Sequence, residues 1–144
     1  MQNTTLYELK KLQTDFPKVQ VLSSEKSADF IRQFYQDDIS IYESFFLLLL
    51  NRQCQTIGYA KISQGGITGT VVDVRIIAKY AVDSLATSII LAHNHPSGNL
   101  QPSEQDILLT NKVKDAMKLF DIAVLDHVIL TEDDFYSFAD KGIL

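Results

Sequence analysis

The chain has 144 residues, 46% of them hydrophobic, so its length and composition predict one domain with a continuous core. Thirteen Lys and Arg residues against 18 Asp and Glu residues give a formal net charge of −5, which argues against a broad nucleic-acid surface. A small local DNA contact stays open, because Lys112, Lys114 and Lys118 share one predicted helical stretch.

The sequence also bears on where the protein acts. A single cysteine, Cys54, excludes an internal disulfide and fits a reducing compartment. Residues 1–11 are polar and lack the apolar region of a signal peptide. The apolar run Phe45–Leu50 is far shorter than the roughly 20 residues that a membrane span needs. The sequence therefore predicts a soluble cytoplasmic protein without a membrane anchor.

The predicted elements begin with a helical N-terminal extension over residues 1–40. An apolar stripe from Leu6 to Leu12 indicates a first helix. Ser24 is the expected N-cap of a second helix, which ends at residues 37–38. Residues 41–144 are expected to form a metal-binding domain.

From residue 44 the apolar period changes to that of buried strands alternating with helices. Because strands and helices interleave, we expect an α/β sheet covered by helices on both faces. Residues 93–102 hold two prolines, one glycine and two asparagines, which predicts a loop. Strands are predicted over residues 45–50, 56–62, 68–71, 88–92, 122–130 and 135–138, and helices over residues 73–86 and 103–120.

Two histidines follow the predicted strand over residues 88–92. His93 and His95 are two positions apart, so an extended chain would point both imidazoles to the same side. Pro96 favours extended dihedrals at the residue before it. Imidazole nitrogens suit zinc at about 2.0–2.1 Å. The pair is therefore a candidate metal site.

Asp106 is expected to supply a third ligand. Ser103 is the expected N-cap of the helix that follows the loop, which puts Asp106 at the third helical position, facing back toward the loop. Three protein ligands leave the fourth tetrahedral position of zinc for water, as in catalytic sites. Zinc lowers the pKa of such a water from about 15.7 to about 7. Other divalent ions also suit this ligand set.

Such a site also needs a general base, and four glutamates are candidates. Glu43 stands where the first buried strand begins, which suits a fixed acid at the end of a sheet. Glu104 would point around its helix, away from the metal. Glu25 lies in a predicted surface helix and Glu132 in a turn.

Together, Glu43, His93-x-His95 and Ser103-x-x-Asp106 resemble the JAMM (MPN+) metalloprotease motif. The closer resemblance is to the RadC-like branch of that family, over roughly residues 40–144. The segments that resemble RadC-like hallmarks are Ile62–Gly65, His93–Gly98, Pro102–Ser103, Asp126–His127 and Tyr136–Phe138.

The resemblance implies a JAB/MPN fold, which is a cytidine-deaminase-like three-layer α/β/α sandwich with a mixed sheet. It implies that His93, His95 and Asp106 bind zinc. It also implies that Glu43 activates the water and that the Ser103 hydroxyl stabilises the oxyanion. The predicted function is zinc-dependent hydrolysis of a peptide or isopeptide amide bond, with a peptide or protein as substrate.

Other functions stay open at this point. One is a binding module associated with DNA repair or mobile elements, with a structural metal site, and another is a metal-dependent nuclease. Many RadC proteins carry an N-terminal helix-hairpin-helix region, and residues 1–40 are too short and too poor in Gly-x-Gly signals to form one. A zinc deaminase is excluded, because it needs a Pro-Cys-x-x-Cys pair and this chain has one cysteine. His127 is interpreted as a buried histidine bonded to backbone or a carboxylate and supporting the site, with a distant fourth ligand as the alternative.

Overall fold

The computed structural model describes residues 1–66 and 70–144, and its strands form a five-stranded sheet in the order β2-β1-β3-β4-β5. The β3–β4 pair is parallel, whereas the other neighbouring pairs are antiparallel, so the predicted mixed sheet is confirmed. The strands are β1 (Ser44–Leu50), β2 (Thr56–Gln64), β3 (Ser88–Asn94), β4 (Ala123–Leu130) and β5 (Phe135–Ser137).

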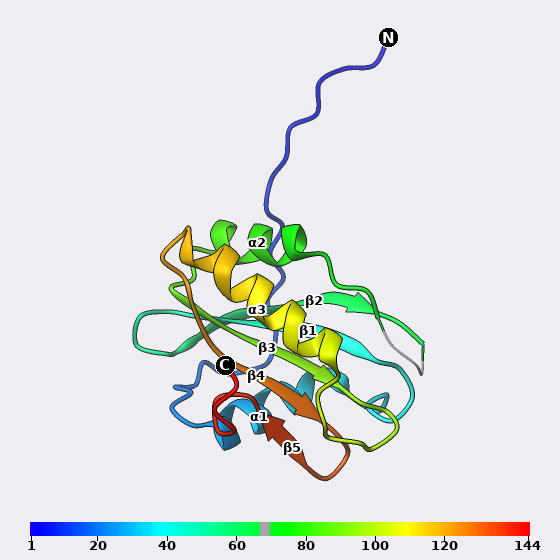
Figure 1. Ribbon diagram of the computed structural model, residues 1–144. Coiled ribbons are helices and arrows are strands. Elements are labelled where there is room, and N and C mark those ends of the chain that lie inside the picture. Colours follow the sequence, from blue (N-terminus) through cyan, green and yellow to red (C-terminus); the bar gives the residue numbers. More distant parts are fainter. Residues whose placement is uncertain (67–69) are drawn as a thin grey trace.

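Helices cover both faces of this sheet, which confirms the predicted three layers (Figure 1). α1 (Ser24–Arg32) and the short 3₁₀ helix η1 (Gln33–Tyr35) lie on one face, whereas α2 (Val74–Asp83) and α3 (Glu104–Lys118) lie on the other. Every residue of β1 and β3 is buried, as expected for strands covered on both sides.

Side-chain alternation along the central strands divides the core in two. In β3, Ile90 and Ala92 pack in the cluster that contains α1, whereas Ile89 and Leu91 pack in the cluster that contains α2 and α3. Because strand side chains repeat every second residue, His93 faces α3 and Asn94 faces the α1 side. The alternation of side chains along β3 therefore decides which of its last residues can contact α3.

A β-bulge at the start of β4 changes which of its residues face which side of the sheet. Ile89 pairs with Val124, but the next residue, Ile90, pairs with Asp126, so Leu125 is an extra residue. Such a bulge turns the following side chains to the other face. As a result His127 lies on the same face as His93, toward α3.

The prediction of helix over residues 1–40 is wrong for its first part. Residues 1–23 contain no helix, and Leu6 and Leu12 are 81% and 80% exposed. The beginning of this segment runs away from the body of the protein in Figure 1. A short amphipathic segment with no surface to pack against does not offset the cost of nucleating a helix.

The second predicted helix is confirmed as α1, with corrected ends. Its N-cap is Ser23 rather than Ser24, because the Ser23 hydroxyl accepts from the Lys26 backbone N–H. The α-helix ends at Arg32 and gives way to η1, before the predicted end at residues 37–38. α1 shares a core cluster with the sheet. The division of the chain after residue 40 stays a prediction.

The remaining elements match with smaller corrections. The predicted strand over residues 68–71 lies partly outside the described residues, and residues 70–71 are not in a strand. β3 continues through Asn94, two residues into the predicted loop, because His93 and Asn94 still pair with β4. In the part of the chain that the structure describes, no helix has the length and apolar character to cross a membrane.

Candidate metal centre

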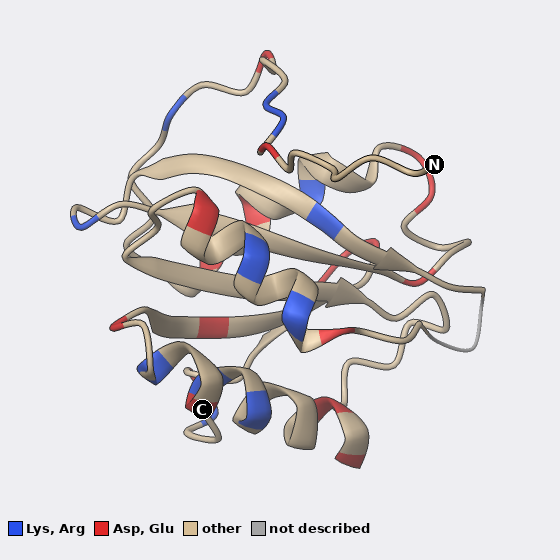
Figure 2. Ribbon diagram, turned by 90° about the horizontal axis from the view of Figure 1, so that it is seen from above, with Lys and Arg blue, Asp and Glu red and all other residues tan. Residues whose placement is uncertain are grey.

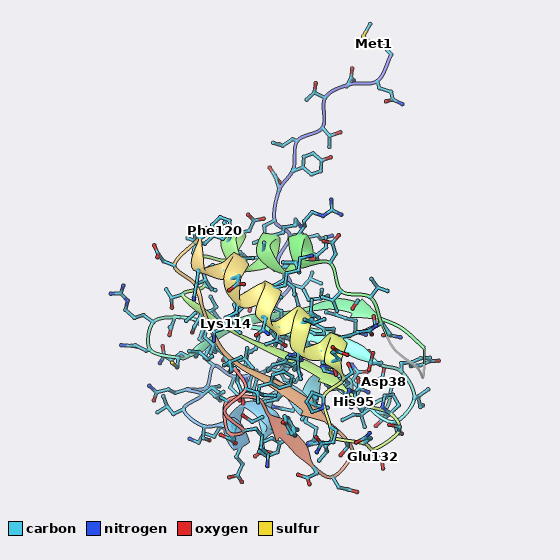
Figure 3. All side chains as sticks on the ribbon, viewed as in Figure 1. Met1, Asp38, His95, Lys114, Phe120 and Glu132 are labelled. Carbon is cyan, nitrogen blue, oxygen red and sulfur yellow. The ribbon has the colours of Figure 1, made fainter. Side chains whose placement is uncertain are left out.

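Segments that lie far apart in the sequence meet at one end of the sheet. His93 is the second-last residue of β3, and His95 follows that strand. Glu43 immediately precedes β1, which runs antiparallel to β3, so the start of β1 lies beside the end of β3. Asp106 lies in the first turn of α3. Figure 3 places His95 near the start of α3, with Phe120 beyond the other end of this helix.

The two histidines and the aspartate present one atom each to a common point. The Nε2 atoms of His93 and His95 are 2.9 Å apart. Asp106 Oδ2 lies 3.4 Å from the first and 3.5 Å from the second. Ligand atoms around a tetrahedral zinc with bonds of about 2.0–2.1 Å are separated by about 3.3–3.4 Å. The three atoms therefore have nearly the spacing of three corners of a zinc site.

The donor chemistry also fits a metal ion. His95 Nδ1 lies 2.6 Å from the Asn99 carbonyl oxygen, which can only accept, so Nδ1 carries the proton and Nε2 presents a lone pair. His93 Nδ1 is likewise engaged away from the cluster, 2.7 Å from His127 Nε2. A cation between the two Nε2 atoms would relieve the repulsion between lone pairs at this distance.

The helix cap aims Asp106 at this point. The Ser103 backbone N–H donates to Asp106 Oδ2 at 2.8 Å, and the Asp106 backbone N–H donates to the Ser103 hydroxyl oxygen at 3.0 Å. This reciprocal capping box confirms the predicted N-cap. Burial alone would raise the pKa of Asp106, but the neighbouring His93 and His95 hold it well below its usual value. Asp106 is therefore ionised at neutral pH.

Glu43 belongs to the same cluster. One carboxylate oxygen of Glu43 and one ring nitrogen each of His93 and His95 all lie within 4.8 Å of one another. The backbone of Glu43 is held on both sides, since its N–H donates to Gly66 O and its carbonyl accepts from Gly65 N–H. These three residues form a possible metal site by themselves, and Asp106 Oδ2, at 3.4 and 3.5 Å from the two histidine Nε2 atoms, adds a fourth candidate ligand.

Ser103 lies at the edge of the cluster. Its hydroxyl oxygen accepts the Asp106 N–H, which leaves the hydroxyl proton free to donate to another group. The side chain is exposed, as a group that meets a substrate must be. The structure thus brings Glu43, His93, His95 and Asp106 together and places Ser103 beside Asp106. The individual roles of these residues stay predictions.

A family model described as the RadC-like JAB domain matches residues 21–143, which is most of the chain. The chain belongs to this family. The predicted resemblance and the predicted JAB/MPN type of α/β fold are thereby confirmed. The match begins at residue 21, so the matched segment includes α1 as well as the sheet.

Curated relatives support the same assignment. A UPF0758 protein of Flavobacterium johnsoniae is 43% identical over 129 residues, which cover 90% of this chain and 56% of that protein. A UPF0758 protein of Porphyromonas gingivalis is 48% identical over 103 residues, or 71% of this chain and 45% of that protein. One of Neisseria meningitidis serogroup B is 42% identical over 97 residues, or 67% of this chain and 43% of that protein. The chain therefore spans about half the length of these relatives.

His127 is buried in the RadC-like JAB domain, as predicted, but its side-chain partners differ from those expected. The ring contacts His93 Nδ1 and Thr110 Oγ1, rather than backbone or a carboxylate. Complete burial, together with the nearby His93, lowers the pKa of His127 well below its ordinary value, so the ring is neutral at pH 7. Its Nε2 lies behind His93 and faces that ring.

Asn94 is a further residue of the site that the sequence analysis missed. Its side-chain oxygen accepts the Ser44 backbone N–H at 2.8 Å, and its amide group donates to the carbonyls of Ile39 at 2.5 Å and Tyr42 at 2.7 Å. Asn94 therefore fastens the segment that carries Glu43 to the strand that carries His93. Its place between the two histidines was a signal, because alternation along an extended chain turns its side chain to the opposite face from theirs.

Asn94→Ala is expected to lower the free energy of unfolding by about 3 kcal/mol, at about 1 kcal/mol for each of the three hydrogen bonds of this buried side chain. Urea unfolding of the purified variant measures this change. The matched control is Asn111→Ala on the exposed side of α3, where a change below about 0.5 kcal/mol is expected. Equal stability of the two variants would refute the role of Asn94.

Proposed function

We propose that this domain is a zinc-dependent hydrolase that cleaves an amide bond in a peptide or protein substrate. The observation that carries the proposal is the convergence of His93 Nε2, His95 Nε2 and Asp106 Oδ2 at distances of 2.9–3.5 Å, with the Glu43 carboxylate beside them. Three ligands of this kind with an open fourth position are typical of catalytic zinc.

Each residue of the site has a chemical task in this proposal. A divalent ion held by His93, His95 and Asp106 would lower the pKa of a water toward 7 and polarise a carbonyl. Glu43 takes the proton of the attacking water and passes it to the leaving amine. The free hydroxyl proton of Ser103 donates to the oxygen that becomes negative in the transition state.

The charge distribution supports a peptide over a nucleic acid as substrate. Figure 2 shows Lys and Arg scattered among Asp and Glu over the elements of the domain. Nucleic-acid binding relies on clustered positive charge. We also propose that the protein acts in the cytoplasm, since its single cysteine fits a reducing compartment.

The first experiment compares the metal content of the purified wild type with that of His95→Ala by elemental analysis. We expect about one zinc per wild-type chain, because three candidate ligand atoms converge, and we expect loss of that zinc in the variant. Ser97→Ala, a change in the exposed part of the same loop, is the matched control and is expected to keep the metal. A zinc-loaded wild type is then assayed on peptide and isopeptide amides.

A wild type that is purified without zinc and does not bind added zinc would overturn the proposal. This result would favour the alternative of a binding module associated with DNA repair or mobile elements. A titration against duplex and branched DNA at two salt concentrations tests that alternative. Cleavage of DNA that is lost in His95→Ala would instead identify a nuclease.

A further inference from the structure

A buried chain of hydrogen bonds connects two of the proposed ligands from behind. The Thr110 hydroxyl donates to the backbone carbonyl of Asp106 at 2.7 Å, and its oxygen lies 2.6 Å from His127 Nδ1. The other ring nitrogen of His127, Nε2, lies 2.7 Å from His93 Nδ1. Thr110, His127 and His93 are all at most 2% exposed, so water does not compete for these bonds.

The proton on each bond of this chain can be assigned. A carbonyl oxygen only accepts, so the single hydroxyl proton of Thr110 points at Asp106 O. Toward His127 the Thr110 oxygen can then only accept, which places the ring proton of His127 on Nδ1. His127 is wholly buried and no carboxylate contacts its ring nitrogens in the described structure, so we assign the ring a single proton, on Nδ1, and a lone pair on Nε2. His93 must then carry its own proton on Nδ1 to make the bond between the two rings. That leaves a lone pair on His93 Nε2, the atom that faces His95 and Asp106.

We propose that Thr110 and His127 are positioning residues, which fix the tautomer of His93 so that its Nε2 lone pair is always turned toward the metal. This inference rests on the proposed metal site and deepens it. The same chain couples the two ligands, since Thr110 is bonded to the backbone of Asp106 one turn earlier on α3. A partner of this kind typically contributes 10–100-fold to metal affinity.

A purely structural role for His127 would leave the tautomer untouched. The ring stacks on Phe138 with centroids 4.6 Å apart and meets the edge of Phe45 at 5.5 Å, so it also fills space in the core. If packing were its whole role, replacing Thr110 would change stability and leave both the His93 proton and the zinc affinity as they are. The hydroxyl of Thr110 belongs to the hydrogen-bond chain, and its removal leaves the packing of the His127 ring unchanged.

The test compares Thr110→Val, which keeps the shape and removes the hydroxyl, with Thr110→Ser, which keeps the hydroxyl. Without an acceptor at Nδ1, the His127 proton is expected to move to Nε2 and to force the His93 proton onto its own Nε2. NMR of ¹⁵N-labelled imidazoles in the metal-free proteins reads both tautomers directly. Zinc affinity, measured by competition with a chelator, is expected to fall by about 10–100-fold in Thr110→Val and to stay within about threefold of wild type in Thr110→Ser.

His127→Gln is a second variant, which keeps one hydrogen-bond acceptor for His93 and one donor for Thr110. Its side-chain oxygen can accept from His93 Nδ1–H while its amide donates to Thr110, so zinc affinity is expected to exceed that of His127→Leu by about tenfold or more. Equal zinc affinity and equal tautomers in Thr110→Val and Thr110→Ser would overturn the inference, as would a His93 proton on Nε2 in the wild type. A wild type that binds no zinc but carries the His93 proton on Nδ1 would instead refute the proposed function and support the assigned tautomer.

Discussion

Glu43→Gln is expected to keep the metal and to lower turnover by about 10²–10⁴, the range that a general base contributes. Glutamine has nearly the shape of glutamate but cannot take a proton from water. The backbone bonds of Glu43 with Gly65 and Gly66 do not involve its side chain, so the segment should hold its place. Zinc content and the rate of amide cleavage, measured on the same preparation, check both halves of this result.

The position of Glu43 within 4.8 Å of both histidines makes the metal measurement decisive. Loss of zinc in Glu43→Gln would show that Glu43 is a ligand, and an unchanged rate would remove it from the mechanism. The matched control is Glu25→Gln, an exposed carboxylate on α1, on the other face of the sheet. It is expected to change neither zinc content nor rate.

Asp106→Asn is expected to reduce zinc affinity by more than about 100-fold, beyond the range of a merely supporting partner. Asparagine removes the negative charge that faces His93 and His95, but its side-chain oxygen can still accept the Ser103 N–H that Asp106 accepts now. The cap of α3 should therefore survive, with a change in unfolding free energy below about 1 kcal/mol. Chelator competition and urea unfolding separate the two effects.

Glu104→Gln is the matched control for this variant. Glu104 lies in the same first turn of α3 and carries the same charge, but it is exposed and outside the cluster. If Asp106→Asn bound zinc as tightly as Glu104→Gln, Asp106 would be a capping residue only, and Glu43 would be the better candidate for the third ligand.

Spacing along the chain was enough to predict most of the fold and the components of the site. The continuous apolar runs predicted β1 and β3 as strands buried on both faces, because such runs leave no side for water. The i and i+2 spacing of His93 and His95 predicted that both rings turn to the same side. Ser103 followed three residues later by an acid predicted a cap, and the capping box has that form.

Local patterns failed where the outcome depends on what a segment packs against. Leu6 to Leu12 has a helical stripe, yet Leu6 and Leu12 are largely exposed, and residues 1–23 form no helix. The residues after Ser24 have a similar stripe and do form a helix, because Ala28 and Ile31 are wholly buried against the sheet. Tertiary packing separates two segments that look alike in sequence.

The sequence by itself predicted which residues meet at the candidate metal centre. His93, His95 and Asp106 follow from strand periodicity and helix capping, whereas the choice of Glu43 among four glutamates came from the resemblance to the JAMM motif. The tertiary structure decided which residues support them. Only the bulge at Leu125 turns His127 toward His93, and only the approach of α3 brings Thr110 to that ring. The hydrogen bonds of Asn94 to Tyr42 and Ser44, on either side of Glu43, likewise join residues some fifty positions apart. Such contacts depend on strand register and helix placement, which are properties of the folded chain.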